Sequence, residues 1–207
     1  MASWYERLIL PKFLACACSG PQMTRQRARL VPRASGRVLE LGVGMGLNLA
    51  FYDPARVSSV SGLDPAPELR AMAEAASRPE GLAVEILPGV AEDLPFAASS
   101  FDSVVCTFTL CSVHAPDRSL AEAMRVLKPG GRLFYCEHGL APEPDVARWQ
   151  RRIEPVWKRL AGGCHLTRPI LPLLERAGFS TSGAECGFLP NVPRFAGWNV
   201  LGEAGKG

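Results

Sequence analysis

The chain has 207 residues, of which 47% are hydrophobic and 21% charged, and its formal net charge is +3. This composition is typical of a globular protein and excludes the disordered and fibrous classes, and the length suits one domain with a sizeable core. The charge is uneven, because residues 1–37 carry seven lysines or arginines against a single acid, Glu6. We therefore expect a basic N-terminal helical arm or lid over residues 1–35 and one domain over residues 36–207.

The start of the chain has two interpretations. Trp4, Tyr5, Leu8, Ile9 and Phe13 fall at helical spacing beside basic residues. Such a stretch suits either peripheral contact with a membrane or a helix folded over the mouth of an active site. Its apolar residues are too few and too interrupted for a signal peptide or a membrane span.

Seven cysteines are scattered along the chain without a C-x-x-C pair. This spacing is neither that of a disulfide framework in a small secreted protein nor that of a zinc site. We therefore expect free thiols, a cytoplasmic location and no bound metal.

The first predicted strand ends in three glycines at alternate positions. The run 38–46 predicts a short apolar strand, a tight turn through Gly42, Gly44 and Gly46, and a weak helix over the next six residues. The pattern E-x-G-x-G-x-G differs from the G-x-G-x-x-G that binds the pyrophosphate of a dinucleotide. A carboxylate at Glu40 suits a ligand that carries an ammonium group, such as S-adenosylmethionine.

The second predicted strand, residues 57–63, is followed by Asp64, twenty residues after Gly44. At this spacing in nucleotide-binding βαβ units, an acidic side chain accepts hydrogen bonds from the ribose hydroxyls. Apolar periodicity further predicts helices over residues 67–77, 117–127, 145–161 and 169–177, and strands over residues 82–87, 103–109, 132–136, 179–186 and 195–201. Pro155 is expected to kink or divide the helix that contains it. The alternation of strand and helix predicts an α/β domain with a parallel sheet.

Four further motifs accompany the glycine turn: L-D-P at 63–65, A-E-D-L-P-F at 91–96, S-F-D at 100–102 and V-L-K-P-G-G at 126–131. In this order they resemble the class I S-adenosylmethionine-dependent methyltransferases, in the branch of the ubiquinone-type C-methyltransferases and small-molecule methyltransferases. The resemblance implies a Rossmann-like, doubly wound α/β sheet of seven strands, mostly parallel, with one antiparallel strand near the C-terminus.

The same resemblance assigns cofactor contacts. The methionine part is expected on the glycine turn with Glu40 under its amino group, and the ribose is expected at Asp64. The remaining expected contacts are Pro65 at the adenine, Ala91 and Glu92 in a turn that meets adenine through a backbone amide, and Thr107 at the end of the fourth strand.

A second set of motifs is similar to the alkyl thiol S-methyltransferases of the methyltransferase-like seven group: V-V-C-T at 104–107, L-C-S-V at 110–113, E-H at 137–138 and G-C-x-L-T-R at 163–168. The implied acceptor is the sulfur of a small-molecule thiol. The alternative is N- or O-methylation of a lipid-like or quinone-like acceptor, as in a phospholipid N-methyltransferase. A nucleic-acid acceptor is not expected, because the fourth strand does not end in a base-methyltransferase motif, and the oligomeric state is left open.

The acceptor is expected at the carboxyl ends of the fourth and fifth strands, where ligands bind in open parallel sheets. His138 is the candidate base, since it follows a strand at this edge and an imidazole titrates near neutral pH. A structural histidine bonded to backbone is the alternative. The residues expected to line the acceptor pocket are Cys111, Ser112, Trp149 and His165, with plain core or helix-capping roles as the competing interpretation.

Overall fold

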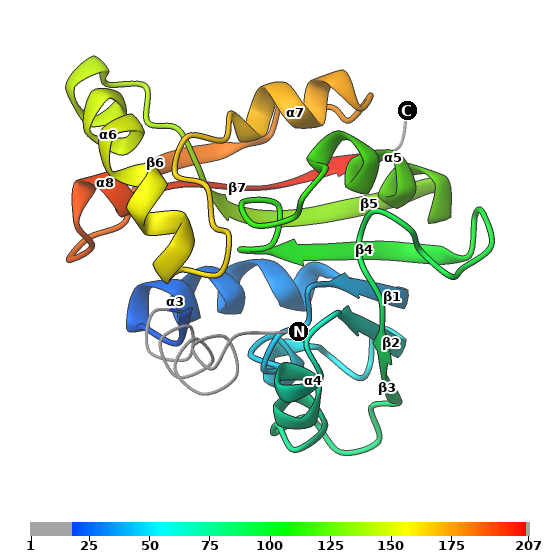
Figure 1. Ribbon diagram of the computed structural model, residues 1–207. Helices are drawn as coiled ribbons and strands as arrows, with labels where there is room; N and C mark the ends of the chain where they lie inside the picture. The colour runs from blue at the N-terminus through cyan, green and yellow to red at the C-terminus, as the bar shows by residue number, and fades with distance from the viewer. Residues whose placement is uncertain (1–17, 206–207) are drawn as a thin grey trace.

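Seven strands pair into one sheet in the order β3-β2-β1-β4-β5-β7-β6, as Figure 1 shows for the computed structural model, which describes residues 18–205. The strands are β1 Gly36–Leu41, β2 Val57–Asp64, β3 Val84–Pro88, β4 Phe101–Thr107, β5 Leu127–His138, β6 Glu185–Phe188 and β7 Trp198–Gly205. The first five strands are parallel, whereas β7 is antiparallel to both β5 and β6. The predicted doubly wound α/β sheet with one antiparallel strand is therefore confirmed.

Proline opens most of the longer helices. The helices are α3 Pro21–Leu30, α4 Pro67–Glu74, α5 Pro116–Val126, α6 Pro144–Leu160, α7 Ile170–Arg176 and α8 Arg194–Gly197, with the short 3-10 helices η1 Val31–Arg33 and η2 Leu49–Phe51. In α3, α4, α5 and α6 a proline lies in the first turn, where its missing N–H removes no helical hydrogen bond. The starts of α4, α5 and α6 agree with the predicted helices to within one residue.

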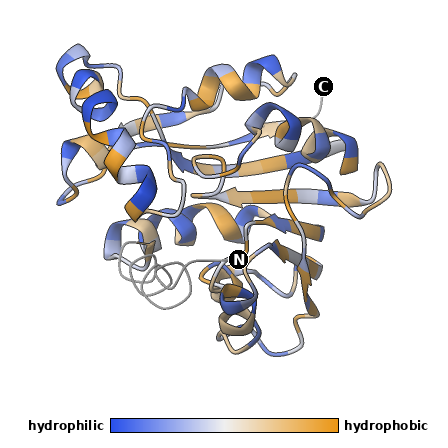
Figure 2. Cartoon of the chain, in the orientation of Figure 1, coloured by the Kyte–Doolittle hydropathy of each residue, from blue (hydrophilic) through white to orange (hydrophobic). Residues whose placement is uncertain are grey.

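The central strands send alternate side chains into two apolar layers. One layer joins Leu39 and Val104 to apolar residues of α5 and α7. The other joins Val38 and Val105 to residues of α3, η1 and η2. Figure 2 shows the central strands largely in the hydrophobic colour and α6 largely in the hydrophilic colour. The sheet is thus buried on both faces, as a parallel sheet requires.

Part of the predicted N-terminal arm belongs to this core. Leu30, Val31 and Ala34 are fully buried in the same cluster as residues of β1 and β4. The amphipathic stretch over residues 4–13 lies outside the described residues, so its membrane or lid role stays a prediction. Within residues 18–205, no helix is both long and apolar enough to cross a membrane.

The two C-terminal strands lie later in the chain than predicted. Phe179 is buried in the core, and a turn closed by a 3.0 Å hydrogen bond from the N–H of Ala184 to the carbonyl of Thr181 precedes β6. The short helix α8 occupies the residues just before Trp198, where β7 begins. The predicted strands 179–186 and 195–201 were therefore placed several residues too early.

Two predicted helical features differ from the structure: the weak helix after the glycine turn is shorter than predicted, and the helix is not divided at Pro155, where a kink stays a prediction. The glycine turn is followed only by the three-residue η2, because all three glycines of the turn have positive φ and keep the chain in successive turns. Helix α6 runs unbroken through Pro155 as one helix of 17 residues. A single proline removes one N–H donor, and the neighbouring turns of this helix continue on both sides of it.

The order of the strands makes β1 and β4 the point at which the sheet changes its direction of growth. From β1 the sheet grows toward β2 on one side and toward β4 on the other. Leu41, the last residue of β1, is paired with Cys106, the penultimate residue of β4. In open α/β sheets, ligands bind beyond the carboxyl ends of the strands at such a switch point. Glu40 and Thr107 both lie at this edge.

Candidate active site

The glycine turn forms an open backbone cradle at the end of β1. Gly42, Gly44 and Gly46 have φ values of +63°, +54° and +75°, in the left-handed region that favours glycine. A methyl group added to Gly42 would overlap the side chain of Thr109. One added to Gly44 would meet nothing closer than the carbonyl oxygen of Gly42, at 3.8 Å. The turn is therefore packed on one side and open at Gly44, as a ligand cradle needs.

Asp64 lies directly against this turn. Its Oδ2 accepts a hydrogen bond from the N–H of Gly44 at 3.1 Å, and its Oδ1 accepts one from the N–H of Ala66 at 2.9 Å. Burial raises the pKa of this carboxyl, and the two backbone donors oppose that shift. The neighbouring carbonyl of Pro65 accepts a hydrogen bond from Arg70 at 3.0 Å. The structure thus brings the predicted ribose ligand next to the predicted methionine cradle.

Glu40 is buried beneath the turn in a small polar network. Its Oε2 accepts a 2.7 Å hydrogen bond from the hydroxyl of Tyr52, and its Oε1 accepts a 3.0 Å bond from the amide nitrogen of Asn48. The same nitrogen donates to the hydroxyl of Thr107 at 3.0 Å. Burial raises the pKa of Glu40 to about 7, against the lowering effect of these donors. The network joins the end of β1 to the end of β4.

The network contains an acceptor without a donor. Oδ1 of Asn48 is buried and has no hydrogen-bond partner among residues 18–205. A buried carbonyl oxygen left in this state is costly, and among residues 18–205 no ion pair neutralises the carboxyl of Glu40 beside it. An ammonium group would donate to both. The residues present therefore fit the amino-acid end of S-adenosylmethionine.

Glu92 has a different position from the other predicted cofactor residues. Its Oε1 accepts hydrogen bonds from the N–H groups of His114 at 2.7 Å and Ala115 at 3.0 Å, at the start of α5. Its side chain therefore anchors the loop after β4, while Ala91 is buried in the core. A contact between the backbone of this turn and adenine stays a prediction.

The carboxylate of Glu137 binds the backbone of the loop between β4 and α5. Its carboxylate accepts hydrogen bonds from the backbone N–H groups of Thr109 at 2.8 Å, Leu110 at 2.9 Å and Cys111 at 3.3 Å. It is completely buried, and burial raises its pKa to about 7 against the lowering effect of these donors. Glu137 thus holds the loop that carries Cys111 over the end of β5.

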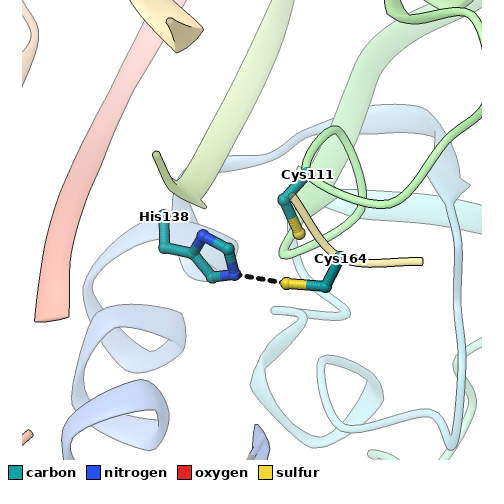
Figure 3. Close-up of side chains that lie close together, drawn as sticks. All are labelled: Cys111, His138 and Cys164. Atoms are coloured by element: carbon teal, nitrogen blue, oxygen red, sulfur yellow. Dashed lines mark hydrogen bonds between the residues drawn. The ribbon is translucent and has the colours of Figure 1, made fainter. Parts of the chain in front are cut away.

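His138, Cys111 and Cys164 converge at the acceptor side of this edge (Figure 3). Nε2 of His138 lies 2.7 Å from Sγ of Cys164, and the indole N–H of Trp157 donates to the same sulfur at 3.3 Å. The nitrogen and the two sulfurs of the three residues all lie within 4.8 Å of one another. Two predicted site residues, Cys111 and His138, are therefore brought together with a third that was not predicted, Cys164.

Cys164 and His138 shift each other's pKa. The contact with Cys111 and the charge of His138 lower the pKa of Cys164 despite its burial. Burial alone would lower the pKa of His138, but the charge of Cys164 outweighs it and the pKa is raised. Nε2 of His138 is engaged by Sγ of Cys164 at 2.7 Å, so this nitrogen is not free to act as a general base in this arrangement.

A buried guanidinium ties the two cysteine-bearing loops together. Arg168 donates to the carbonyl oxygens of Leu110 and Val113, the latter at 2.6 Å. The N–H of His165 donates to the carbonyl of Cys111 at 2.8 Å. The positions of Cys111 and Cys164 are therefore fixed relative to each other by backbone contacts.

The other predicted pocket residues are placed differently. Ser112 donates its hydroxyl to the carbonyl of Thr109 at 3.0 Å, so it serves the loop. The Nδ1 of His165 lies 3.3 Å from the carboxylate of Glu154. Trp149 is 60% exposed. This exposed position does not support its predicted role in closing a pocket.

Trp157, two turns further along α6, is the tryptophan that reaches the cluster. It packs against the buried residues Cys111, Ala161 and Cys164. The helical spacing of the tryptophans was visible in the sequence, but the face of α6 that turns inward depends on the loop after it. Asn48 and Tyr52 were missed because no motif marks them. Cys164 lies inside the G-C-x-L-T-R motif, although nothing local in that motif names its partner.

A cavity of about 540 Å³ lies at the opposite edge of the sheet and does not belong to this site. Its lining includes Asp102 of β4 and Lys128 and Arg132 of β5. Lys128 is paired with Asp102 and Arg132 with Glu203, each at 2.7 Å. These charges are thus paired within the fold.

Comparison with known proteins agrees with the site. Residues 39–135 match a family model described as a methyltransferase domain. The chain is 43% identical over 181 residues to the thiol S-methyltransferase TMT1B of Homo sapiens, covering 84% of this chain and 72% of that protein. It is 39% identical over 173 residues to TMT1B of Rattus norvegicus, covering 82% and 70%.

Among solved structures, a putative methyltransferase from Bacillus halodurans superposes with a TM-score of 0.68 at 22% identity, covering 88% of this chain and 96% of that chain. At this identity the likeness concerns the fold alone. The fold, the cradle with its unpaired acceptor and the sequence relatives agree. The chain belongs to the class I S-adenosylmethionine-dependent methyltransferases, in the group that contains the TMT1-type thiol S-methyltransferases.

Proposed function

We propose that this methyltransferase transfers the methyl group of S-adenosylmethionine to the sulfur of a small-molecule thiol. The observation that carries the proposal is the position of the Cys111, His138 and Cys164 cluster at the carboxyl ends of β4 and β5, at the same edge of the sheet as the predicted cofactor residues. The identity to thiol S-methyltransferases spans both halves of this arrangement, since it covers more than 80% of the chain.

The cofactor supplies a methyl group on a positively charged sulfur. Glu40 and Oδ1 of Asn48 are proposed to hold the ammonium end, the open backbone at Gly44 to receive the methionine chain, and Asp64 to bind the ribose. We propose that these groups align the methyl group with the ends of β4 and β5, where the acceptor would bind. Alignment of this kind accounts for a large part of the rate of a bimolecular displacement.

The reaction is an in-line displacement in which the acceptor's thiolate attacks the methyl carbon. The new sulfur–carbon bond forms as the sulfonium–carbon bond breaks, and the products are a methyl thioether and S-adenosylhomocysteine. The acceptor's proton must leave before or during attack. A free thiol has a pKa near 8.5 and is a few per cent ionised at neutral pH, so the protein needs only to favour the anion. We propose that His138 contributes to this step at the acceptor end of the site.

We also propose a cellular location and binding partners for this protein. We place the protein in a reducing, cytoplasmic compartment, which the free thiols of all six described cysteines support. The proposed partner is a small molecule and not a nucleic acid. Peripheral contact with a membrane is proposed only for the N-terminal stretch before residue 18.

The test is methylation of an acceptor panel by purified protein, followed by mass spectrometry. The panel contains alkyl and aryl thiols, amines, phenols, quinols and phosphatidylethanolamine vesicles. We expect methyl thioethers as the main products. Methylation of the phospholipid or quinol without thioether formation would support the alternative acceptor class and contradict the proposal.

A further inference from the structure

We propose that Cys111, His138 and Cys164 form a binding site for a zinc ion, with a fourth position open to the acceptor thiol. The ion site stands on the geometry of the three side chains alone. Only its use of the fourth position rests on the proposed thiol methylation.

The three candidate ligands come from separate parts of the chain and point at a common space. Cys111 follows β4, His138 ends β5 and Cys164 follows α6. Their two sulfurs and the Nε2 atom lie within 4.8 Å of one another, and Figure 3 shows them directed toward one another. Such a site is invisible to a search for C-x-x-C spacing, because no two of its ligands are close in sequence. The expectation of no bound metal rested on that spacing.

The ligand types select the ion. Two thiolates and an imidazole are soft and borderline donors that suit zinc better than magnesium or calcium. Two thiolates also neutralise the charge of Zn²⁺ in a place where both cysteines are nearly fully buried. Three protein ligands with one position left open are the arrangement of catalytic rather than structural zinc.

The distances require only a small adjustment. Nε2 of His138 and Sγ of Cys164 are 2.7 Å apart, in direct contact. Zinc bonds of about 2.0 Å to nitrogen and 2.3 Å to sulfur at a tetrahedral angle separate such atoms by about 3.5 Å. Side-chain rotation that moves the two atoms apart by less than about 1 Å therefore opens the space for the ion.

The surroundings hold the ligands in place. Glu137 accepts the N–H of Cys111 at 3.3 Å, and the indole N–H of Trp157 donates to Sγ of Cys164 at 3.3 Å. Arg168 fixes the loop of Cys111 from the segment that also carries Cys164. Outer contacts of this kind orient ligands and tune the metal in known sites.

The ion gives the thiol acceptor a route to its reactive form. A thiol that takes the fourth position loses its proton to solvent and binds as a thiolate. That thiolate attacks the methyl carbon, the sulfonium–carbon bond breaks, and the neutral thioether leaves the ion, whose oxidation state does not change. No side chain is then required as a general base, which agrees with the engagement of Nε2 of His138 by Cys164.

The experiment measures metal content, with the full chain purified under reducing conditions and then loaded with zinc alone. Mass spectrometry of the metal should find about one tightly held zinc per chain, and Cys111→Ser, Cys164→Ser and His138→Gln should each lose most of it. Cys186→Ser is the matched control, because Cys186 is an exposed cysteine that does not belong to the cluster. Binding of S-adenosylhomocysteine by each variant shows that it has folded.

Cobalt provides a second readout that does not depend on activity. Loaded with Co²⁺, the protein should show a thiolate-to-cobalt absorption band that weakens in either cysteine variant and persists in Cys186→Ser. A folded protein that holds no more zinc than a variant combining Cys111→Ser, Cys164→Ser and His138→Gln overturns the inference. So does thiol methylation at full rate after removal of all zinc, while the proposed function then stands. Stoichiometric zinc in a protein that methylates no thiol leaves the ion site intact and refutes the proposed function.

Discussion

Nε2 of His138 lies 2.7 Å from Sγ of Cys164, although 26 residues separate them in the chain. The contact joins the end of β5 to the loop after α6, and Cys111 completes the group from the loop after β4. The acceptor end of the site is therefore assembled from the end of one strand and two loops, whereas its cofactor end is built mainly on β1 and β2.

Replacement of His138 should separate methyl transfer from cofactor binding. We expect His138→Gln to lower the rate of methyl transfer by about 100-fold, the scale of losing a group that handles charge in the transition state. The affinity for S-adenosylhomocysteine should not change, because His138 does not belong to the Glu40 network. Single-turnover kinetics and calorimetry measure the two quantities. His114→Gln, in an exposed loop position, is the control, and an equal loss in both variants would remove His138 from the mechanism.

The two tryptophans of α6 should differ in their effects. Trp157→Phe keeps an aromatic ring against Phe195 but removes the N–H that bonds to Cys164. We expect a fall in turnover of about tenfold, the worth of one hydrogen bond to a charged group. Trp149→Phe should leave turnover unchanged, since Trp149 is largely exposed. If only Trp149→Phe lowered turnover, Trp149 and not Trp157 would contact the acceptor, which would contradict this assignment.

Cofactor binding should be linked to a proton on Glu40. Its pKa is raised to about 7, so the carboxyl of the ligand-free protein is mainly protonated below pH 7. The ammonium group of the ligand favours the carboxylate, so binding below pH 7 releases a proton, and the affinity should rise with pH by up to about tenfold per unit before levelling off above pH 7. Calorimetry of S-adenosylhomocysteine in two buffers of different ionisation enthalpy detects the proton.

Two variants isolate this linkage, because Glu137 also has a pKa raised to about 7. Glu40→Gln should abolish the proton release, and Tyr52→Phe should keep it, since that change leaves the carboxyl in place. If Glu40→Gln still released a proton on binding the ligand, that proton would come from another group than Glu40. Without ligand, the stabilising effect of protonated Glu40 is complete below its unfolded pKa near 4.5 and is lost as the pH rises through 7.

The two ends of the glycine turn should respond differently to a methyl group. Gly42→Ala places the methyl against Thr109 at a positive φ, so it should lower the free energy of unfolding by about 2 kcal/mol or more. Gly44→Ala meets open space, so it should cost only about 1 kcal/mol for its backbone conformation while it obstructs the cofactor. Chemical denaturation and calorimetry test the pair. Unchanged affinity in Gly44→Ala would show that the cofactor does not approach this backbone.

The fold was predictable because its signals are local. The apolar runs, the proline starts and the glycine turn identify their elements without knowledge of distant contacts. The position of Asp64 beside Gly44 was also predictable from the sequence, because a spacing of twenty residues leads from the end of one parallel strand to the end of its neighbour. The late placement of β6 and β7 was not predictable, since the turn before Ala184 competes with a strand over the same apolar residues.

The acceptor end was predictable only in part. Cys111 and His138 were found because both follow strands that end at the active edge. Cys164 was not, because its position depends on Arg168 reaching the carbonyls of Leu110 and Val113 across more than 50 residues of chain. Asn48 likewise meets Glu40 only after the glycine turn has folded back over β1.

The most direct measurement is a competition between acceptors in one vessel. Purified protein is given S-adenosylmethionine with a deuterated methyl group, an alkyl thiol and phosphatidylethanolamine vesicles, and mass spectrometry follows the label with time. The proposed function predicts that the label enters the thioether first, and that Cys164→Ser slows this product while binding of S-adenosylhomocysteine is retained. Label that enters only the phospholipid, or thioether formation that is unaffected by Cys164→Ser, would contradict a thiol methyltransferase whose acceptor site is built on Cys111, His138 and Cys164.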